Sequence, residues 1–142
     1  MQTNKKTNIT VEATINVPVE KAWEYFTNPE HITKWNFASD DWHCPESTND
    51  LRPGGKLFAR MEAKDESFGF DFEAVYNTVE PHEKIEYTIA DGRKVRIDFK
   101  PQGRATHVTE TFEAEDTNSL DMQKAGWQAI MDNYKKYTEK IN

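Results

Sequence analysis

Residues 126–137, GWQAIMDNYKKY, decide the fold, because they place aromatic and apolar side chains at helical spacing. A helix cannot bury a wide aromatic stripe by itself, so this one needs a sheet to cover it. Gly126 is expected to let the helix approach that sheet closely. The stripe recurs at 3.6-residue spacing and comprises Trp127, Ile130, Tyr134, Tyr137 and Ile141.

A second aromatic segment, residues 17–35, reads VPVEKAWEYFTNPEHITKW and predicts two short helices. Pro18 suits the start of the first helix, where its missing N–H costs nothing. Asn28 and Pro29 interrupt that helix, and Pro29 can open the second one, which runs to Trp35. Asn118 or Ser119 is a suitable cap for the long final helix.

Between the helices the hydrophobic period changes to two, which indicates strands. Asp91-Gly92 is the strongest hairpin signal in this part of the chain. Residues 36–54 contain Pro45, Pro53 and Gly54 and read as a long loop, which in a compact domain is often functional. The expected strands lie within residues 9–17, 57–63, 68–76, 85–89, 95–99 and 108–112.

These elements predict an α+β helix-grip fold: a curved six-stranded antiparallel sheet wrapped on the long C-terminal helix, with two short helices after the first strand. A chain of 142 residues suits one domain, and we expect it at residues 9–142 after a flexible N-terminal segment, residues 1–8. A curved sheet and a straight helix do not fit flush. The fold therefore predicts a cavity between the sheet and the helix, with room for a ligand.

Composition restricts the partners and the compartment. The net charge of −7 argues against nucleic acid and anionic membrane surfaces, because both select for basic patches. Cys44 is the only cysteine, which excludes an internal disulfide and suits a reducing compartment. We find no apolar run near the ~20 residues of a bilayer span and no signal peptide. A cytoplasmic monomer or weak dimer is expected.

Four segments follow one another along the chain: VPVEKAW at 17–23, NPEHITKW at 28–35, LRPGGK at 51–56 and GWQ at 126–128. In this order they resemble the AHSA1-like family of the START/Bet v 1-like (SRPBCC) superfamily. The family is named for an activator of the ninety-kilodalton heat-shock chaperone's ATPase. The resemblance implies a helix-grip fold with an internal cavity, and through the chaperone a role in the stress response. Its relatives include lipid carriers, polyketide cyclases and antibiotic-sequestering proteins.

Glu110 is the most informative polar residue. Strand alternation puts it on the same face as Val108 and Phe112, whose apolar side chains should point inward. A carboxylate there is costly unless it is hydrogen-bonded, paired or protonated. It could anchor a ligand or act as a general acid or base; the alternatives are a structural hydrogen bond and a bulge that turns it outward.

The leading hypothesis is a binder of a small apolar or aromatic ligand between the sheet and the C-terminal helix, with no cofactor and no metal. His43 and Glu110 would supply polarity, and Trp42 could act as an aromatic lid. The acidic and sulfur side chains around His43 lack the spacing of a metal site. The expected ligand-binding residues are Trp35, Trp42, His43, Phe70, Tyr87, Glu110, Trp127, Met131 and Tyr134.

Two other functions stay open. One is a chaperone co-factor that works through its surface, which predicts an exposed apolar patch away from the cavity. The other is an enzyme of the cyclase or hydrolase type, with Glu110 and His43 as its weak catalytic candidates. The enzyme hypothesis requires both side chains within hydrogen-bond reach of a common point.

Overall fold

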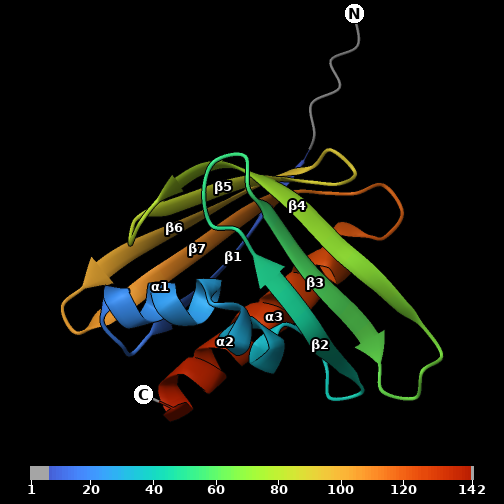
Figure 1. The fold of residues 1–142 in the computed structure, drawn as a ribbon, viewed down its shortest axis with the longest axis horizontal. Helices are drawn as coiled ribbons and strands as arrows, with labels where there is room; N and C mark the ends of the chain where they lie inside the picture. The colour runs from blue at the N-terminus through green and yellow to red at the C-terminus, as the bar shows by residue number, and fades with distance from the viewer. Residues whose placement is uncertain (1–6, 142) are drawn as a thin grey trace, which may run out of the picture.

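The computed structural model describes residues 7–141 and folds them into one sheet and three helices (Figure 1). Residues 1–6 of the expected flexible segment lie outside the described residues, and Asn8 already belongs to the first strand. The elements are β1 (Asn8–Ile15), α1 (Val19–Thr27), α2 (Pro29–Trp35), β2 (Trp42–Asn49), β3 (Lys56–Ala63), β4 (Gly69–Glu80), β5 (Lys84–Ile89), β6 (Lys94–Gln102), β7 (Ala105–Glu113) and α3 (Leu120–Ile141).

The sheet has the strand order β1-β7-β6-β5-β4-β3-β2, and every neighbouring pair is antiparallel. Figure 1 shows the sheet strongly curved, with α3 running across it and with α1 and α2 gathered at one end. The α+β helix-grip fold is thus confirmed. It has seven strands where the alternation predicted six.

The additional strand, β2, lies inside the stretch predicted to be a loop, residues 36–54, so that prediction was wrong there. Its side chains do not alternate between buried and exposed, because a bulge between His43 and Glu46 shifts the register. Pro45 lies in this bulge, and β2 is an edge strand, where a missing backbone N–H is tolerated. The alternation that reveals a strand in a sequence is therefore absent.

The local signals for the helix ends are confirmed. Pro18 precedes α1, and the side chain of Asn28 accepts a hydrogen bond from the backbone N–H of Glu30 at the start of α2. Ser119 caps α3, because its Oγ accepts a hydrogen bond from the N–H of Met122. No helix in the described part of the chain has both the length and the apolar character of a bilayer span.

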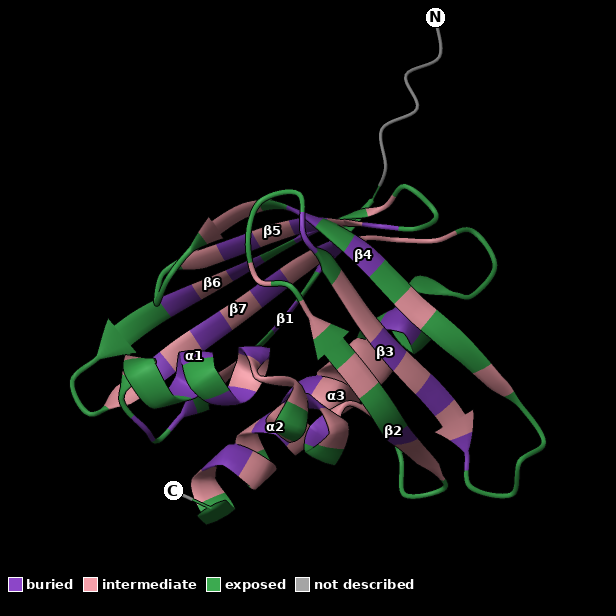
Figure 2. Ribbon diagram, in the orientation of Figure 1, coloured by how far each residue is buried: buried purple, intermediate pink, exposed green. Residues whose placement is uncertain are grey.

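The core lies between the concave face of the sheet and α3. Buried and less buried residues alternate along β5, β6 and β7, as Figure 2 shows. On α3, Met131 and Tyr134 are buried, whereas Ile141, an expected member of the stripe, is 44% exposed. The ring of Trp127 stacks on that of Phe112 in β7, with centroids 3.8 Å apart. This stack joins the helix to the sheet.

The expectation that Gly126 permits a close helix approach was wrong, because a Cβ built there meets no atom within 4 Å. Gly126→Ala should therefore stabilise the protein by about 1 kcal/mol, since alanine is the better helix former. Thermal unfolding should show a melting temperature higher by roughly 3 °C. A lower melting temperature would mean that the helix does need glycine at this position.

Candidate functional site

A cavity of about 250 Å³ lies between the sheet, α3 and the end of α2. It reaches the surface near Phe70, which lines the cavity and is 43% exposed. Most of the lining is apolar, and it comes from the sheet and from all three helices. The lining residues are Phe26, Thr27, Ile32, Trp35, Asn36, Leu57, Ala59, Met61, Phe70, Phe72, Tyr76, Ile85, Tyr87, Arg93, Ile97, Glu110, Trp127, Ile130 and Met131.

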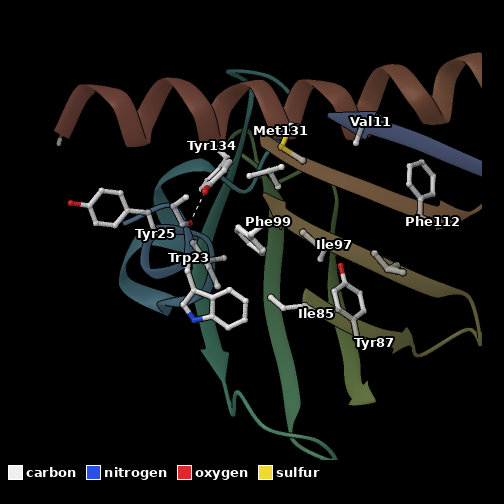
Figure 3. Close-up of a cluster of buried hydrophobic side chains, with 14 of the residues drawn as sticks. Val11, Trp23, Tyr25, Ile85, Tyr87, Ile97, Phe99, Phe112, Met131 and Tyr134 are labelled. Atoms are coloured by element: carbon white, nitrogen blue, oxygen red, sulfur yellow. Dashed lines mark hydrogen bonds between the residues drawn. The ribbon is translucent and has the colours of Figure 1, made fainter. Parts of the chain in front are cut away.

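Six of the nine expected ligand-binding residues line this cavity. Four of them come from the sheet and the short helix, and two come from α3. Met131 points from α3 toward the sheet, and Tyr87 and Ile97 project from the sheet toward that helix (Figure 3). The six residues are Trp35, Phe70, Tyr87, Glu110, Trp127 and Met131.

Tyr134 is fully buried but is not part of the lining. Its hydroxyl donates a 2.6 Å hydrogen bond to the backbone carbonyl of Ala22, marked by the dashed line in Figure 3. Its ring packs against Phe26 and Trp35. Tyr134 therefore connects α3 to the two short helices behind the cavity wall.

Trp42 and His43 also lie outside the lining, because residues 42 and 43 start the edge strand β2. The ring of Trp42 packs against Phe68 and Phe70 at the end of β4. The Nε2 atom of His43 is 3.5 Å from a carboxylate oxygen of Glu62. The structure therefore does not bring His43 to the cavity wall beside Glu110.

Glu110 lies where strand alternation predicted it, on the cavity wall and only 8% exposed. Its neighbours across the sheet are Val11 and Ile97, which are buried and apolar. No hydrogen bond or ion pair joins its carboxyl group to another residue within 7–141. Burial raises the pKa of this carboxyl group to about 8, because an apolar wall disfavours the charged form.

The hydroxyl of Tyr87 is the second polar group of the lining without a hydrogen-bond partner among the described residues. Burial raises the pKa of Tyr87 well above its ordinary value, and the nearby charge of Glu110 raises it further. The hydroxyl of Tyr76, by contrast, donates a 2.6 Å hydrogen bond to Asn49. The carboxyl group of Glu110 and the hydroxyl of Tyr87 can thus each form a hydrogen bond with a molecule in the cavity.

Sequence reasoning did not find Asn36 and Arg93 as lining residues. Asn36 lay in the stretch expected to be a loop, and its side-chain amide contacts the sulfur of Met61. Arg93 follows the Asp91-Gly92 turn and falls just before β6, where the alternation begins. The Asp91-Gly92 hairpin signal could have indicated that Arg93 lies just before the strand that pairs back onto β5.

Cys44 is buried beside β3, and burial raises the pKa of its thiol, which disfavours the reactive thiolate. Within residues 7–141, no group of three or more histidine, cysteine, aspartate and glutamate side chains is arranged to hold a metal ion. The polar side chains that line the cavity carry carboxyl, hydroxyl, amide and guanidinium groups.

The family model described as "Activator of Hsp90 ATPase homolog 1-like protein" matches residues 16–139, which include every strand except β1 and all of the helices but the last two residues of α3. The chain belongs to the AHSA1-like family. The resemblance of the four sequence segments is thereby confirmed. A comparison with curated proteins gave no match.

Solved structures agree with this assignment. An AHSA1-like protein from Aeromonas hydrophila is 40% identical, with a TM-score of 0.89, over 95% of this chain and 94% of that one. Chr148 from Cytophaga hutchinsonii is 48% identical, with a TM-score of 0.81, over 94% of this chain and 93% of that one. A protein from Nitrosomonas europaea, 17% identical with a TM-score of 0.84 over the full length of both chains, shares the fold.

Proposed function

We propose that this AHSA1-like protein binds a small apolar or aromatic molecule in the cavity between its sheet and α3. The observation that carries the proposal is the apolar cavity of about 250 Å³ itself. Protein interiors are close-packed, and voids larger than a water molecule are few. An apolar cavity of about 150 Å³ is enough to bind benzene, so this cavity has room for a substituted ring.

The lining supports an aromatic ligand. Seven of its residues are aromatic, and their rings offer faces and edges on which a second ring can stack. Trp127 is held by its stack on Phe112, so one wall is fixed before a ligand arrives. A rigid wall lowers the conformational entropy that binding costs. The six lining residues that the sequence predicted, from Trp35 to Met131, are proposed to contact this ligand.

The surface gives less support to a chaperone co-factor. That hypothesis requires an exposed apolar patch away from the cavity. The exposed rings of Phe68 and Phe70 do form a patch with Trp42, but Phe70 also lines the cavity. The patch is therefore at the cavity's rim. A cytoplasmic location belongs to the proposal and is supported by the buried, unpaired Cys44.

The proposal is tested by adding atoms to the cavity. Ala59 is 1% exposed and lines the cavity, so Ala59→Leu should place a larger side chain inside it. The unsubstituted protein, the parent, is screened by thermal shift with one-ring and two-ring aromatic compounds. A bound compound should stabilise it by about 2.7 kcal/mol when its concentration is 100 times the dissociation constant. Ala59→Leu should bind the same ligands at least about tenfold more weakly.

Ala125→Leu is the matched control, because residue 125 is exposed on α3 and does not line the cavity. It adds the same atoms outside the protein and should leave binding unchanged. Equal binding by the parent and Ala59→Leu would put the ligand elsewhere. The proposal fails if no compound raises the melting temperature of the parent.

A further inference from the structure

Two polar side chains on the mostly apolar cavity wall have no hydrogen-bond partner among the described residues. Glu110 is on β7 and Tyr87 on β5, with β6 between them. Ile97 of β6 pairs with Glu110, and Val95 pairs with Tyr87, so the two residues face the same side of the sheet and lie diagonally, two strands and two residues apart. The charge of Glu110 is near enough to raise the pKa of Tyr87.

The other polar side chains of the lining already have partners. The hydroxyl of Thr27 donates to the carbonyl of Trp23 at 2.8 Å, and that of Tyr76 donates to Asn49. Asn36 donates to the sulfur of Met61. The Nε atom of Arg93 donates to Asp91 at 2.8 Å. Asn36 and Arg93 keep further donor atoms, but Glu110 and Tyr87 are the polar side chains of the lining that make no hydrogen bond at all among the described residues.

Glu110 faces no group that would keep it ionised. The side chains opposite it on β1 and β6 are Val11 and Ile97, and those of α3 on the cavity are Trp127, Ile130 and Met131. The titratable and charged groups around the cavity are Tyr76 of β4, Tyr87 of β5, Arg93 before β6 and, behind the wall, Tyr134 of α3. Burial raises the pKa of all three tyrosines, so their hydroxyls stay protonated.

A carboxyl group without a partner in apolar surroundings is neutral near pH 7 and can then donate a hydrogen bond. With Glu110 neutral, the formal charge of the lining is the guanidinium of Arg93, which is paired with Asp91. A cationic ligand would find no counter-charge in such a cavity. A neutral oxygen acceptor would find two O–H donors.

We propose that the cavity selects an uncharged, ring-sized molecule with a carbonyl oxygen, which accepts hydrogen bonds from Glu110 and Tyr87. A carbonyl oxygen has two lone pairs and can accept from both groups at once. The inference rests on the proposed function, since it names the chemical class of the ligand in the same cavity.

Three probes of one shape test this selectivity. Acetophenone carries the carbonyl oxygen, α-methylstyrene replaces it with a CH₂ group, and 1-phenylethylamine carries an ammonium group. Binding is followed by NMR through the indole N–H signals of Trp35 and Trp127, which line the cavity. Trp23 is outside the lining and serves as the internal control. At about pH 6, acetophenone should bind about tenfold more tightly than α-methylstyrene, and the amine most weakly.

Two substitutions at residue 110 test whether Glu110 causes the preference for acetophenone over α-methylstyrene. Glu110→Leu removes one of the two donors, so the preference for acetophenone over α-methylstyrene should shrink to what the Tyr87 hydroxyl alone supplies. Glu110→Gln keeps an N–H donor and should keep the preference. In the parent the preference should shrink as the pH rises through about 8, where Glu110 ionises. In Glu110→Gln it should not depend on pH, and Tyr87→Phe should weaken it in either background.

The outcomes separate the two proposals. If α-methylstyrene binds as tightly as acetophenone, or if the amine binds best, the carbonyl selectivity is wrong while the cavity remains a binding site. If none of the three probes shifts the signals of Trp35 and Trp127, both proposals fail. A preference for acetophenone that is undiminished in Glu110→Leu would overturn the role of Glu110.

Discussion

Glu110→Gln is expected to raise the melting temperature by about 10 °C at pH 7, which corresponds to about 3 kcal/mol in the free energy of unfolding. The reason is the burial of the carboxyl group, which is 8% exposed and has no hydrogen-bond partner within 7–141. In the unfolded chain this group is ionised near its ordinary pKa of 4.5, whereas the folded protein holds that pKa at about 8. Glutamine avoids the cost of neutralising the group.

The ionisation of Glu110 makes the free energy of unfolding depend on pH. Below about pH 4.5 the carboxyl group is protonated in both states and contributes nothing. Between about 4.5 and 8 the folded state binds a proton that the unfolded state has released, so stability falls as the pH rises. Above about pH 8 the full penalty, about 5 kcal/mol, is reached. The gain from glutamine should therefore be near zero at about pH 4 and largest at about pH 9.

Urea unfolding of both proteins at the three pH values measures this difference. Glu73→Gln is the matched control, because Glu73 is exposed on β4, and its substitution should change stability by less than about 0.5 kcal/mol. A gain from Glu110→Gln that is the same at every pH would contradict the ionisation argument. A loss of stability would mean that the carboxyl group has a partner that glutamine cannot replace.

The sequence predicted the sheet wherever one face of a strand is buried and the other is wet. The alternation around Glu110 placed that carboxyl group inside correctly, because Val108 and Phe112 on either side are fully buried. The same logic could not find β2, which is an edge strand with a bulge at Pro45. Its pattern of burial changes phase at that bulge, so no single alternation runs along the strand.

The candidate site was predictable where it depends on the direction of a side chain and unpredictable where it depends on the path of the chain. Trp35 and Trp127 line the cavity because each lies on the apolar face of its helix. His43 and Glu110 were paired as candidates, but the chain carries His43 along an edge strand to Glu62. That Glu110 has no partner within residues 7–141 is also a tertiary property, since it depends on every element around the cavity.

Phe112→Ala is expected to destabilise the protein by about 3–5 kcal/mol and to lower its melting temperature by more than about 10 °C. Phe112 is 0% exposed and lies between Ile9 of β1 and Val95 of β6. Its ring also stacks on Trp127, with an interplanar angle of 12°. Removing it leaves a void behind the tryptophan and takes away the ring that joins α3 to the sheet.

The matched control for this prediction is Phe68→Ala, which removes the same ring from a position that is 62% exposed. Phe68 contacts Trp42 and Phe70 at the cavity's rim, so its loss should cost less than about 1 kcal/mol. Chemical unfolding of the two variants compares a ring that carries the attachment of α3 with one that does not. Equal effects would show that the Phe112–Trp127 stack does not hold the helix on the sheet. The cavity wall at Trp127 would then have to be fixed by Ile130 and Met131, the other two lining residues of α3.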